Sequence, residues 1–270
     1  MPELPEVETI VRGLAGSVVG KRIRSAEVRL RKAAVAPAGV AFEAALAGRR
    51  VTAARRRGKY AIVDLEGGRS LVTSLRMTGR LVVQGPREHD FPATHVVLRF
   101  TDGTRLSFAD VRTFGRMRLV ERAEAWDQML GIEPLSPGFT PEVFMSMLAG
   151  RTTPIKVLLL DQRRIAGIGN IYACEALWEA RIPPGRPAKA LTKPAIRRLH
   201  DAIVDVLGRA IEKRGTSVDD YVDAGGLRGG FQNALSVYGR RDRACVRCGG
   251  RIVRTVLGQR GTWWCRRCQR

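Results

Sequence analysis

Two Cys-x-x-Cys pairs at the C-terminal end restrict the fold of this chain more than any other feature. Cys245 and Cys248 form the first pair, Cys265 and Cys268 form the second, and residues 249–264 lie between them. This spacing is typical of a four-cysteine zinc site, in which four thiolates close the tetrahedron and the metal is structural. The intervening segment has a strand–turn–strand pattern, so we predict a zinc β-hairpin. The alternative is a pair of redox-active dithiols.

The chain is strongly basic. Its 270 residues contain 47 Lys and Arg against 26 Asp and Glu, a formal net charge of +21. Such a charge predicts a polyanionic partner, nucleic acid before a membrane surface, and the alternative is a protein that is merely basic and soluble. A hydrophobic content of 44% indicates a folded chain. We find no secretory signal and no apolar run long enough to span a bilayer, so we expect a cytoplasmic protein without a membrane partner.

The predicted secondary structure changes along the chain. Residues 5–17 have a helical pattern with a proline in the first turn. Short β-rich runs separated by turn signals follow from about 20 to 122 and predict a sandwich or barrel. Residues 131–139 contain two prolines and two glycines and read as a linker. Helical patterns then dominate, notably at 140–150 and 193–215.

A glycine-rich turn at 165–172, IAGIGNIY, precedes one of these helices. Its glycines let a ligand approach the backbone, and Asn170 is expected to cap the helix that continues to about Ala180. A helix N-terminus of this kind favours phosphate, and Lys156 would add positive charge. Tight helix packing is the alternative explanation for the glycines.

The N-terminus can provide a reactive amine. Removal of Met1 is expected in front of the small Pro2, which leaves a secondary amine. An α-amino group has a pKa of roughly 7.7–8.0, so a neutral fraction exists near pH 7 that can attack a sugar carbon and form an iminium. Glu3 could move the proton that this reaction requires. An ordinary chain start without any role is the alternative.

Several separated motifs together point to one family. They occur in order along essentially the whole chain: MPELPEVET at 1–9, RRGKY at 56–60, MTGRL at 77–81, GIGNIY at 167–172, VYGR at 237–240 and the four-cysteine hairpin. In this combination the chain resembles the formamidopyrimidine-DNA glycosylases.

The resemblance implies an α+β multidomain fold. We expect an N-terminal catalytic β-sandwich with a leading helix over 1–131, a helix–two-turns–helix DNA-binding domain over 132–238, and a zinc finger with one structural Zn²⁺ over 239–270. The implied partner is double-stranded DNA that contains oxidised bases or abasic sites. The implied activity is removal of oxidised purines, mainly 8-oxoguanine and formamidopyrimidines, followed by β,δ-elimination at the abasic site. One lesion requires one copy of the enzyme, so we expect a monomer.

The resemblance also implies roles for individual residues. Pro2 would be the nucleophile, Glu3 the general acid/base, Glu6 a supporting residue and Lys59 the lysine near the scissile phosphate and the lesion. Arg260 is expected among both the catalytic and the DNA-binding residues. The other implied DNA-binding residues are Lys156 and Asn170 on phosphates, and Met77, Arg112 and Phe114 in the space that the extruded lesion leaves. Core packing is the alternative for Met77 and Phe114. The glycine-rich stretch 223–230 corresponds to the family's flexible lesion-capping loop.

Four positions depart from the family pattern. The family usually has His-Leu-Gly-Met where this chain has SLRM at 74–77, so Ser74 replaces a phosphate-contacting histidine and Arg76 replaces a glycine. Thr113 stands where the family has a second arginine before the phenylalanine. Cys174 stands where aspartate is usual, and we interpret it as a small buried residue. Because Pro2, Glu3 and Lys59 remain, we expect catalysis to survive.

Two alternatives stay open. A glycosylase of the endonuclease VIII type would prefer oxidised pyrimidines, but that branch typically begins Met-Pro-Glu-Gly-Pro-Glu and lacks the Met77, Arg112 and Phe114 set. A non-catalytic zinc protein that binds damaged DNA would share the charge and the cysteines, but it would have no need of Pro2 and Glu3.

Overall fold

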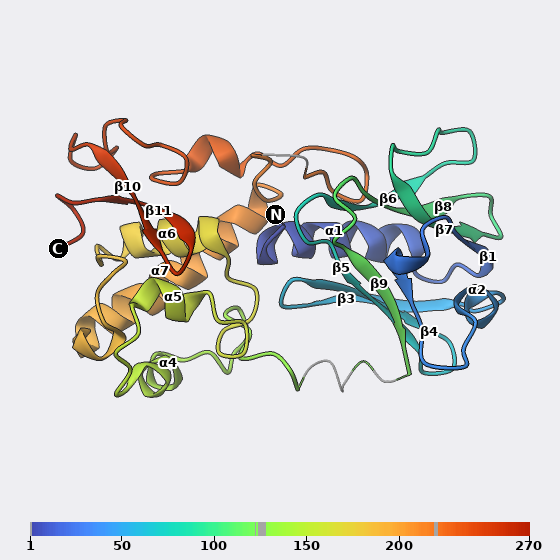
Figure 1. Ribbon diagram of the computed structural model, residues 1–270, viewed down its shortest axis with the longest axis horizontal. Helices are drawn as coiled ribbons and strands as arrows, with labels where there is room; N and C mark the ends of the chain where they lie inside the picture. The colour runs from blue at the N-terminus through green and yellow to red at the C-terminus, as the bar shows by residue number, and fades with distance from the viewer. Residues whose placement is uncertain (1, 122, 124–127, 219–220) are drawn as a thin grey trace. The chain divides into compact units, whose positions relative to one another are not determined.

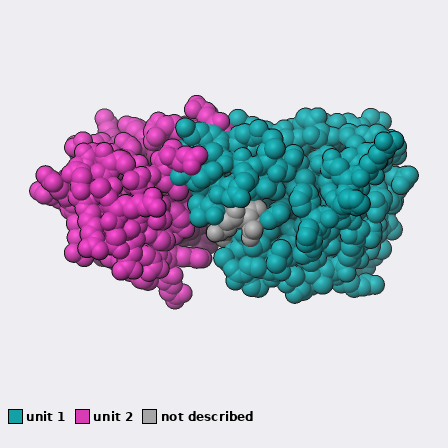
Figure 2. Space-filling model, turned by 90° about the horizontal axis from the view of Figure 1, so that it is seen from above, with its two compact units in different colours: residues 1–129, 213–232 teal, residues 130–212, 233–270 magenta. Residues whose placement is uncertain are grey.

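The computed structural model describes residues 2–121, 123, 128–218 and 221–270 (Figure 1). They form two compact units, coloured separately in Figure 2. Unit 1 comprises residues 1–129 and 213–232, and unit 2 comprises residues 130–212 and 233–270. The segment 213–232 therefore packs with the N-terminal part of the chain. The predicted domain boundaries stay predictions.

Unit 1 begins with helix α1 (Leu4–Val18), which confirms the helix predicted from residue 5. Glu3 and Glu6 form a capping box at its N-terminus, in which each side chain accepts the other residue's backbone N–H. Apolar residues recur at helical spacing and form the buried face: Leu4, Val7, Ile10, Val11, Leu14 and Val18. Helix α1 packs against strands β3 (Val51–Arg57), β4 (Tyr60–Leu65) and β6 (Gly79–Gln84).

Two sheets follow α1 in unit 1. The first has the order β1-β7-β8-β6 and is antiparallel. Its strands are β1 (Ile23–Val28), β6 (Gly79–Gln84), β7 (Thr94–Phe100) and β8 (Arg105–Asp110). The second has the order β2-β9-β5-β4-β3 and is antiparallel except between β2 and β9. Its strands are β2 (Ala34–Val35), β3 (Val51–Arg57), β4 (Tyr60–Leu65), β5 (Ser70–Ser74) and β9 (Arg116–Val120).

One apolar core joins both sheets and α1. Phe100 and Phe108 enter it from the first sheet, Leu71 and Leu119 from the second, and Leu14 from α1. Each such side chain stabilises the fold by about 1.5–3 kcal/mol when fully buried. The chain therefore has the predicted β-sandwich with a leading helix.

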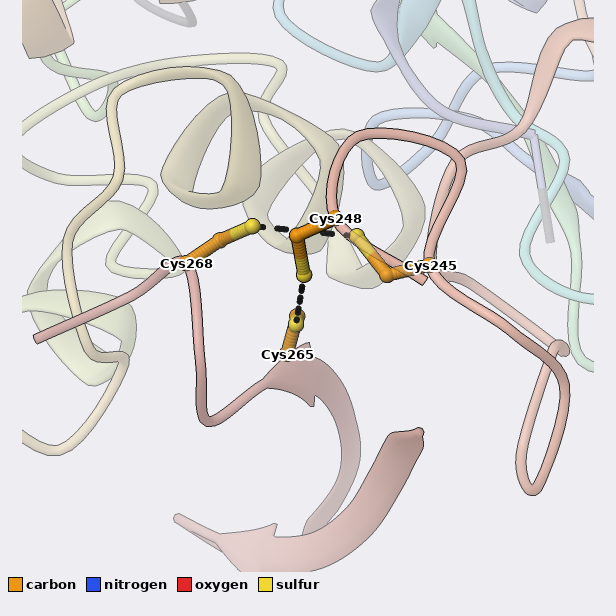
Figure 3. A group of neighbouring side chains, drawn as sticks. All are labelled: Cys245, Cys248, Cys265 and Cys268. Atoms are coloured by element: carbon orange, nitrogen blue, oxygen red, sulfur yellow. Dashed lines mark hydrogen bonds between the residues drawn. The ribbon is translucent and has the colours of Figure 1, made fainter. Parts of the chain in front are cut away.

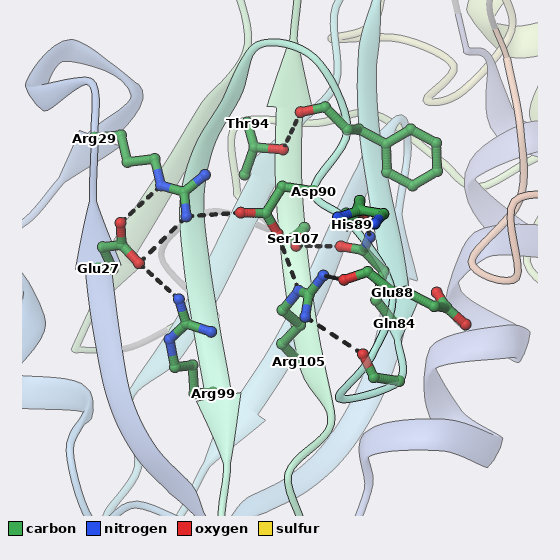
Figure 4. Close-up of polar contacts among 12 residues, drawn as sticks. Glu27, Arg29, Gln84, Glu88, His89, Asp90, Thr94, Arg99, Arg105 and Ser107 are labelled. Atoms are coloured by element: carbon green, nitrogen blue, oxygen red, sulfur yellow. Dashed lines mark hydrogen bonds and ion pairs between the residues drawn. The ribbon is translucent and has the colours of Figure 1, made fainter.

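A network of charged residues fastens the β6–β7 connection to the first sheet (Figure 4). Asp90 lies 2.7 Å from Arg29 Nη2 and 3.0 Å from Arg105 Nε. Glu27 pairs with both Arg29 and Arg99. Burial raises the pKa of Asp90, but the hydrogen bond and charge of Arg29 outweigh it and lower the pKa overall. The connection is thereby held by ion pairs as well as by the backbone.

Unit 2 is helical, as predicted. Its helices are α4 (Pro141–Leu148), α5 (Ile155–Leu159), α6 (Asn170–Glu179) and α7 (Lys193–Glu212). Thr140 caps α4 by accepting the N–H of Val143 at 3.3 Å. Helix α6 is buried on nearly all sides and packs against α7, whose outer face is charged.

The cysteine-rich end of unit 2 forms the predicted β-hairpin, with strands β10 (Ile252–Leu257) and β11 (Arg260–Cys265). Gly258 and Gln259 connect them, both with positive φ, as a two-residue hairpin turn requires. The remaining short elements of the chain are η1 (Arg31–Ala33), α2 (Phe42–Leu46), η2 (Ala188–Ala190) and η3 (Phe231–Ala234). Among the helices that the structure describes, none is long and apolar enough to cross a bilayer.

Candidate functional site

The N-terminal candidate residues sit at the start of α1 and are buried. Pro2 directly precedes Glu3, which is the N-cap of the helix and is 2% exposed. The Glu6 carboxylate accepts the N–H of Glu3 through Oε2 at 2.8 Å. Carboxylates at a helix N-terminus are favoured by the helix dipole. The capping box therefore fixes the backbone that carries Pro2.

Glu6 also joins α1 to the segment that returns from residue 213. Its Oε1 accepts the N–H of Thr216 at 2.7 Å, and its carbonyl oxygen accepts the hydroxyl of Tyr221 at 3.3 Å. Burial, and then the charge of Glu6, raise the pKa of Tyr221, so this hydroxyl keeps its proton. Gly215 has φ +77, and a Cβ there would lie 2.8 Å from Glu6 Oε1. Only glycine therefore permits this close approach.

Lys59 lies in the two-residue turn between β3 and β4. Gly58, with φ +55, makes the turn possible. Arg56 ties the turn to α1, because its Nε donates to Glu8 Oε2 at 2.9 Å and its Nη1 donates to the carbonyl of Gly58 at 3.0 Å. Burial raises the pKa of Glu8, but Arg56 and Arg12 outweigh it and hold the pKa below its usual value. Sequence reasoning missed Glu8 and Arg56.

Met77, Arg112 and Phe114 come together at one end of the sandwich. Met77 and Phe114 are 43% and 52% exposed. Neither residue therefore packs in the core of unit 1. Arg112 lies between them, with Nη1 2.8 Å from Met77 Sδ and its guanidinium 4.9 Å from the centre of the Phe114 ring. Exposed apolar side chains gathered around a cation form a surface suited to stacked bases.

Two departures from the family pattern lie in the loops that carry these residues. Arg76 has φ +55 and Thr113 has φ +56, a backbone conformation that costs a non-glycine residue about 1–3 kcal/mol. The Thr113 hydroxyl accepts a hydrogen bond from Lys32 Nζ at 2.8 Å. Ser74 Oγ lies 3.5 Å from the carbonyl of Arg116. The chain therefore carries strain in this region that glycine at position 76 would relieve.

Lys156 in unit 2 is fully buried. Its ammonium group donates to Asn170 Oδ1 at 2.6 Å, to the carbonyl of Gly261 at 3.0 Å and to Thr262 Oγ1 at 2.7 Å. A lysine ammonium has three N–H donors, which is enough to form these three bonds. In this arrangement the charge lies beneath the hairpin turn, whereas the neighbouring Arg260 is exposed.

Asn170 does not cap its helix, so that expectation was wrong. Gly169 is the N-cap residue and Asn170 is the first residue of α6. The Asn170 side chain accepts from Lys156 and donates through Nδ2 to the carbonyl of Gly261 at 3.0 Å. The amide therefore has a charged donor in Lys156 on one side and a backbone acceptor of the cysteine hairpin on the other.

Glu175 is a buried acid that sequence reasoning missed. Its buried carboxylate accepts the backbone N–H groups of Ser236, Val237 and Tyr238 at 2.8–3.0 Å. Burial raises the pKa of Glu175, and these donors counteract the shift. An acid in the otherwise apolar run NIYACEALW was the available signal, because such an acid needs donors when it is buried. Cys174 beside it is buried, as expected.

The glycine-rich stretch 223–230 is organised around a buried carboxylate. Asp223 Oδ1 accepts the N–H groups of Gly225 and Leu227 at 2.9 and 3.0 Å, and Asp223 Oδ2 pairs with Arg214. The carbonyl of Ala224 accepts the N–H of Val83 at 2.9 Å, which fastens the start of the loop to β6. Leu227, which closes this turn opposite Asp223, is 57% exposed.

The four cysteines form one cluster (Figure 3). Their sulfur atoms all lie within 4.8 Å of one another, with 3.8 Å between Cys245 and Cys268 and 3.6 Å between Cys248 and Cys265. Four sulfurs about 2.3 Å from a tetrahedral zinc ion are about 3.8 Å apart. The donor set and its spacing therefore fit a structural zinc ion, whose coordination by the four thiolates would cross-link the two ends of the hairpin.

The surroundings already favour a thiolate at one of these positions. Burial raises the pKa of Cys245, but a hydrogen bond from Trp178 Nε1 at 3.4 Å and backbone N–H groups outweigh it and lower the pKa to about 6. Burial and the neighbouring sulfurs raise the pKa of Cys268 to about 12. A cation bound by the cluster would remove the remaining protons.

Comparison with known proteins accounts for this set of features. Three family models match the chain: the formamidopyrimidine-DNA glycosylase N-terminal domain over residues 1–117, the H2TH domain of the same enzymes over 130–221, and a zinc finger found in Fpg and IleRS over 244–270. The chain belongs to the formamidopyrimidine-DNA glycosylase family. It is thus a member of a family of DNA glycosylases that act on damaged DNA.

Individual relatives match over their full lengths. A formamidopyrimidine-DNA glycosylase of Heliobacterium modesticaldum is 47% identical, and the alignment covers 100% of both chains. Among solved structures, a mutant of the Lactococcus lactis enzyme in complex with Fapy-dG-containing DNA has a TM-score of 0.91 and 34% identity, with 100% of both chains covered. The L. lactis enzyme bound to abasic-site DNA has a TM-score of 0.91 and 34% identity, with 99% of both chains covered. These matches confirm the family and the fold class predicted from the motifs.

Proposed function

We propose that the protein is a bifunctional base-excision-repair enzyme that removes oxidised purines from double-stranded DNA and then cleaves the abasic strand. The observation that carries this proposal is the full-length family match, together with the presence of Pro2 and Glu3 at the start of α1. The L. lactis relatives were solved with DNA containing Fapy-dG or an abasic site, which are a substrate and an intermediate of such a reaction.

The proposed first step uses the terminal amine. After removal of Met1, the nitrogen of Pro2 bonds to C1′ of the damaged nucleoside while the bond from C1′ to the base breaks; the base leaves with that electron pair and takes a proton from water. Glu3 takes the proton that the nitrogen loses and returns it to O4′ as the C1′–O4′ bond opens, which gives an iminium. Its fixed place at the N-cap keeps Glu3 next to Pro2.

The strand is then cut by two eliminations. Loss of a proton from C2′ to water breaks the C3′–O3′ bond, and loss of a second proton, from C4′ to water, breaks the C5′–O5′ bond. Each oxygen leaves on its phosphate with the electron pair of the broken bond. Water finally hydrolyses the iminium and releases Pro2. Lys59, held by the Arg56 contacts with α1 and Gly58, would offset the charge of the departing phosphate.

The remaining candidate residues would bind and shape the DNA. We assign Met77, Arg112 and Phe114 to the space left by the extruded lesion, because they are clustered and two of them are exposed apolar groups. Arg260 would contact a phosphate from the hairpin turn. Lys156 would serve that contact indirectly, through Asn170 and the backbone of Gly261. We propose one structural Zn²⁺, a monomer and a cytoplasmic location.

Borohydride trapping on an abasic-site or 8-oxoguanine duplex tests this proposal. We expect a covalent complex, mapped by mass spectrometry to residue 2, and its loss in Pro2→Gly with duplex binding retained. Failure of the unaltered protein to form any covalent species would defeat the enzymatic proposal in favour of a damage-binding protein. A clear preference for thymine glycol over 8-oxoguanine would instead indicate an endonuclease VIII-type specificity.

The DNA-binding part of the proposal has its own test. Each phosphate contact releases counterions, so log Kd should rise with log salt concentration with a slope of roughly 0.9 per contact. Several Lys and Arg contacts predict a slope well above 2 on undamaged duplex. A nearly flat dependence would contradict a phosphate-dominated interface.

A further inference from the structure

Asp110 lies between the two loops that carry Met77, Arg112 and Phe114. It is the last residue of β8 and is 1% exposed. We infer that Asp110, acting with Thr78, is the positioning residue that holds these three side chains ready for insertion into DNA. This inference rests on the proposed function, because it concerns how the insertion is achieved.

The first argument is the hydrogen bonding of Asp110. Its Oδ1 accepts the Thr78 hydroxyl and lies 3.2 Å from the N–H of Arg112. Its Oδ2 accepts the N–H of Gly115 at 2.6 Å. One carboxylate thus binds the backbone on both sides of Phe114. Bonds to an ionised acceptor are about twice as strong as neutral ones, so the carboxylate is an effective anchor.

The backbone of Asp110 is also fixed from the sheet. Its N–H donates to the carbonyl of Ala93 at 3.0 Å. Its carbonyl accepts His95 Nε2 at 2.7 Å and the N–H of Thr113 at 3.0 Å. His95 belongs to β7, next to β8 in the same sheet. Asp110 therefore connects both loops to the backbone of the sheet.

Thr78 provides the link between the two loops. Its hydroxyl donates to Asp110 and accepts the N–H of Arg112 at 3.1 Å. Both bonds reach a residue more than thirty positions away in the sequence. Since Thr78 follows Met77 directly, the same hydroxyl fixes the position of Met77 relative to Arg112.

The backbone packs closely around Asp110 and Thr78. A Cβ on Gly79 would lie 2.3 Å from the carbonyl oxygen of Leu75, and a Cβ on Gly115 would lie 2.8 Å from that of Ser74. Arg76 and Thr113 keep positive φ angles, which persist only where the surroundings hold them. Such preorganisation lowers the entropic cost of placing exposed side chains between bases.

Thr78→Val tests the link with the least disturbance, because it removes the hydroxyl and keeps the shape. Thr78→Ser is the rescue variant, and Asp110→Asn is the stronger perturbation. Ser107→Ala is a matched control. Ser107 is buried in the same strand as Asp110, and its hydroxyl donates one hydrogen bond to Gln84 Oε1, which the variant lacks (Figure 4). Each variant is measured for its urea midpoint, for trapping on an abasic-site duplex and for the single-turnover rate of 8-oxoguanine excision. The fluorescence of 2-aminopurine placed beside the lesion reports unstacking in the excision experiment.

We expect Thr78→Val and Asp110→Asn to slow 8-oxoguanine excision about 10- to 100-fold and to reduce the 2-aminopurine signal. Abasic-site trapping, which has no base to unstack, should change less than about 3-fold. Thr78→Ser should restore both readouts, and Ser107→Ala should leave them unchanged at a similar urea midpoint. Normal excision and unstacking in Thr78→Val, with trapping intact, would overturn the inference and leave the proposed function standing. An equal loss of all readouts that follows the urea midpoint, and extends to Ser107→Ala, would also overturn it. Absence of trapping in the unaltered protein would instead refute the proposed function itself.

Discussion

Replacement of Lys156 by methionine separates two explanations of this residue. The family resemblance implies a phosphate contact, whereas the structure buries the ammonium group against Asn170, Gly261 and Thr262. Methionine has a similar length and no charge, so it removes the three hydrogen bonds with little change in volume. Lys189→Met is the matched control, because Lys189 is an exposed lysine of unit 2 and its loss changes the net charge equally.

The magnitude follows from the contacts. Each hydrogen bond from a charged donor contributes about 1.5–3 kcal/mol net, and the acceptors left behind lose their partner. Removal of a buried charge also recovers part of its desolvation cost, which offsets some of this loss. We expect Lys156→Met to lower the free energy of unfolding by about 3 kcal/mol. With an m-value of about 2 kcal/mol/M, the urea midpoint falls by about 1.5 M.

Tryptophan fluorescence is a suitable probe, because Trp178, Trp263 and Trp264 belong to unit 2. DNA affinity supplies the functional readout. If Lys156 positions the turn that carries Arg260, Lys156→Met and Arg260→Ala should weaken DNA binding by less together than the sum of their separate effects. Lys189→Met should leave the urea midpoint within about 0.3 M of the unaltered protein.

Two results would refute this reasoning. A urea midpoint of Lys156→Met equal to that of Lys189→Met would mean that the buried hydrogen bonds contribute nothing. Fully additive effects of Lys156→Met and Arg260→Ala on DNA affinity would mean that the two residues act on DNA independently, as two direct phosphate contacts would.

Three further predictions concern stability. Arg76→Gly should raise the free energy of unfolding by about 0.5–1 kcal/mol, since relief of the positive φ exceeds the added entropy of the unfolded chain, and an unchanged or lower thermal midpoint would contradict it. The lowered pKa of Glu8 contributes stability that is present above its unfolded pKa of about 4.3 and is lost as pH falls through its lower folded pKa, so Glu8→Gln should flatten the decline of stability below about pH 5; an unchanged pH profile would argue against the Arg56 contact. Removal of zinc by a chelator should unfold the hairpin, shift the fluorescence of Trp263 and Trp264 and abolish DNA binding, whereas a fully demetallated protein with unchanged fluorescence would show that the metal is dispensable.

Much of this protein is determined by short-range sequence patterns. The spacing of Cys245, Cys248, Cys265 and Cys268 is sufficient to predict the hairpin, because a four-thiolate site allows few backbone arrangements. Helix α1 follows from its apolar period and its proline, and the strands follow from alternation and turn glycines. The grouping of Met77 with Arg112 and Phe114 was predicted from family resemblance, since no local pattern brings these positions together.

Tertiary structure alone decided how the candidate residues are held. Lys156 and Gly261 are 105 positions apart, and so the burial of the lysine depends on where the hairpin packs and on no property of its neighbours in sequence. The same holds for Glu6, whose carboxylate meets Thr216 from 210 positions away, and for Thr78 and Asp110, 32 positions apart. A polar group that folding buries must find a hydrogen-bond partner. Long-range packing determines which partner each group finds. These contacts fix the positions of the candidate residues, which the motifs alone do not specify.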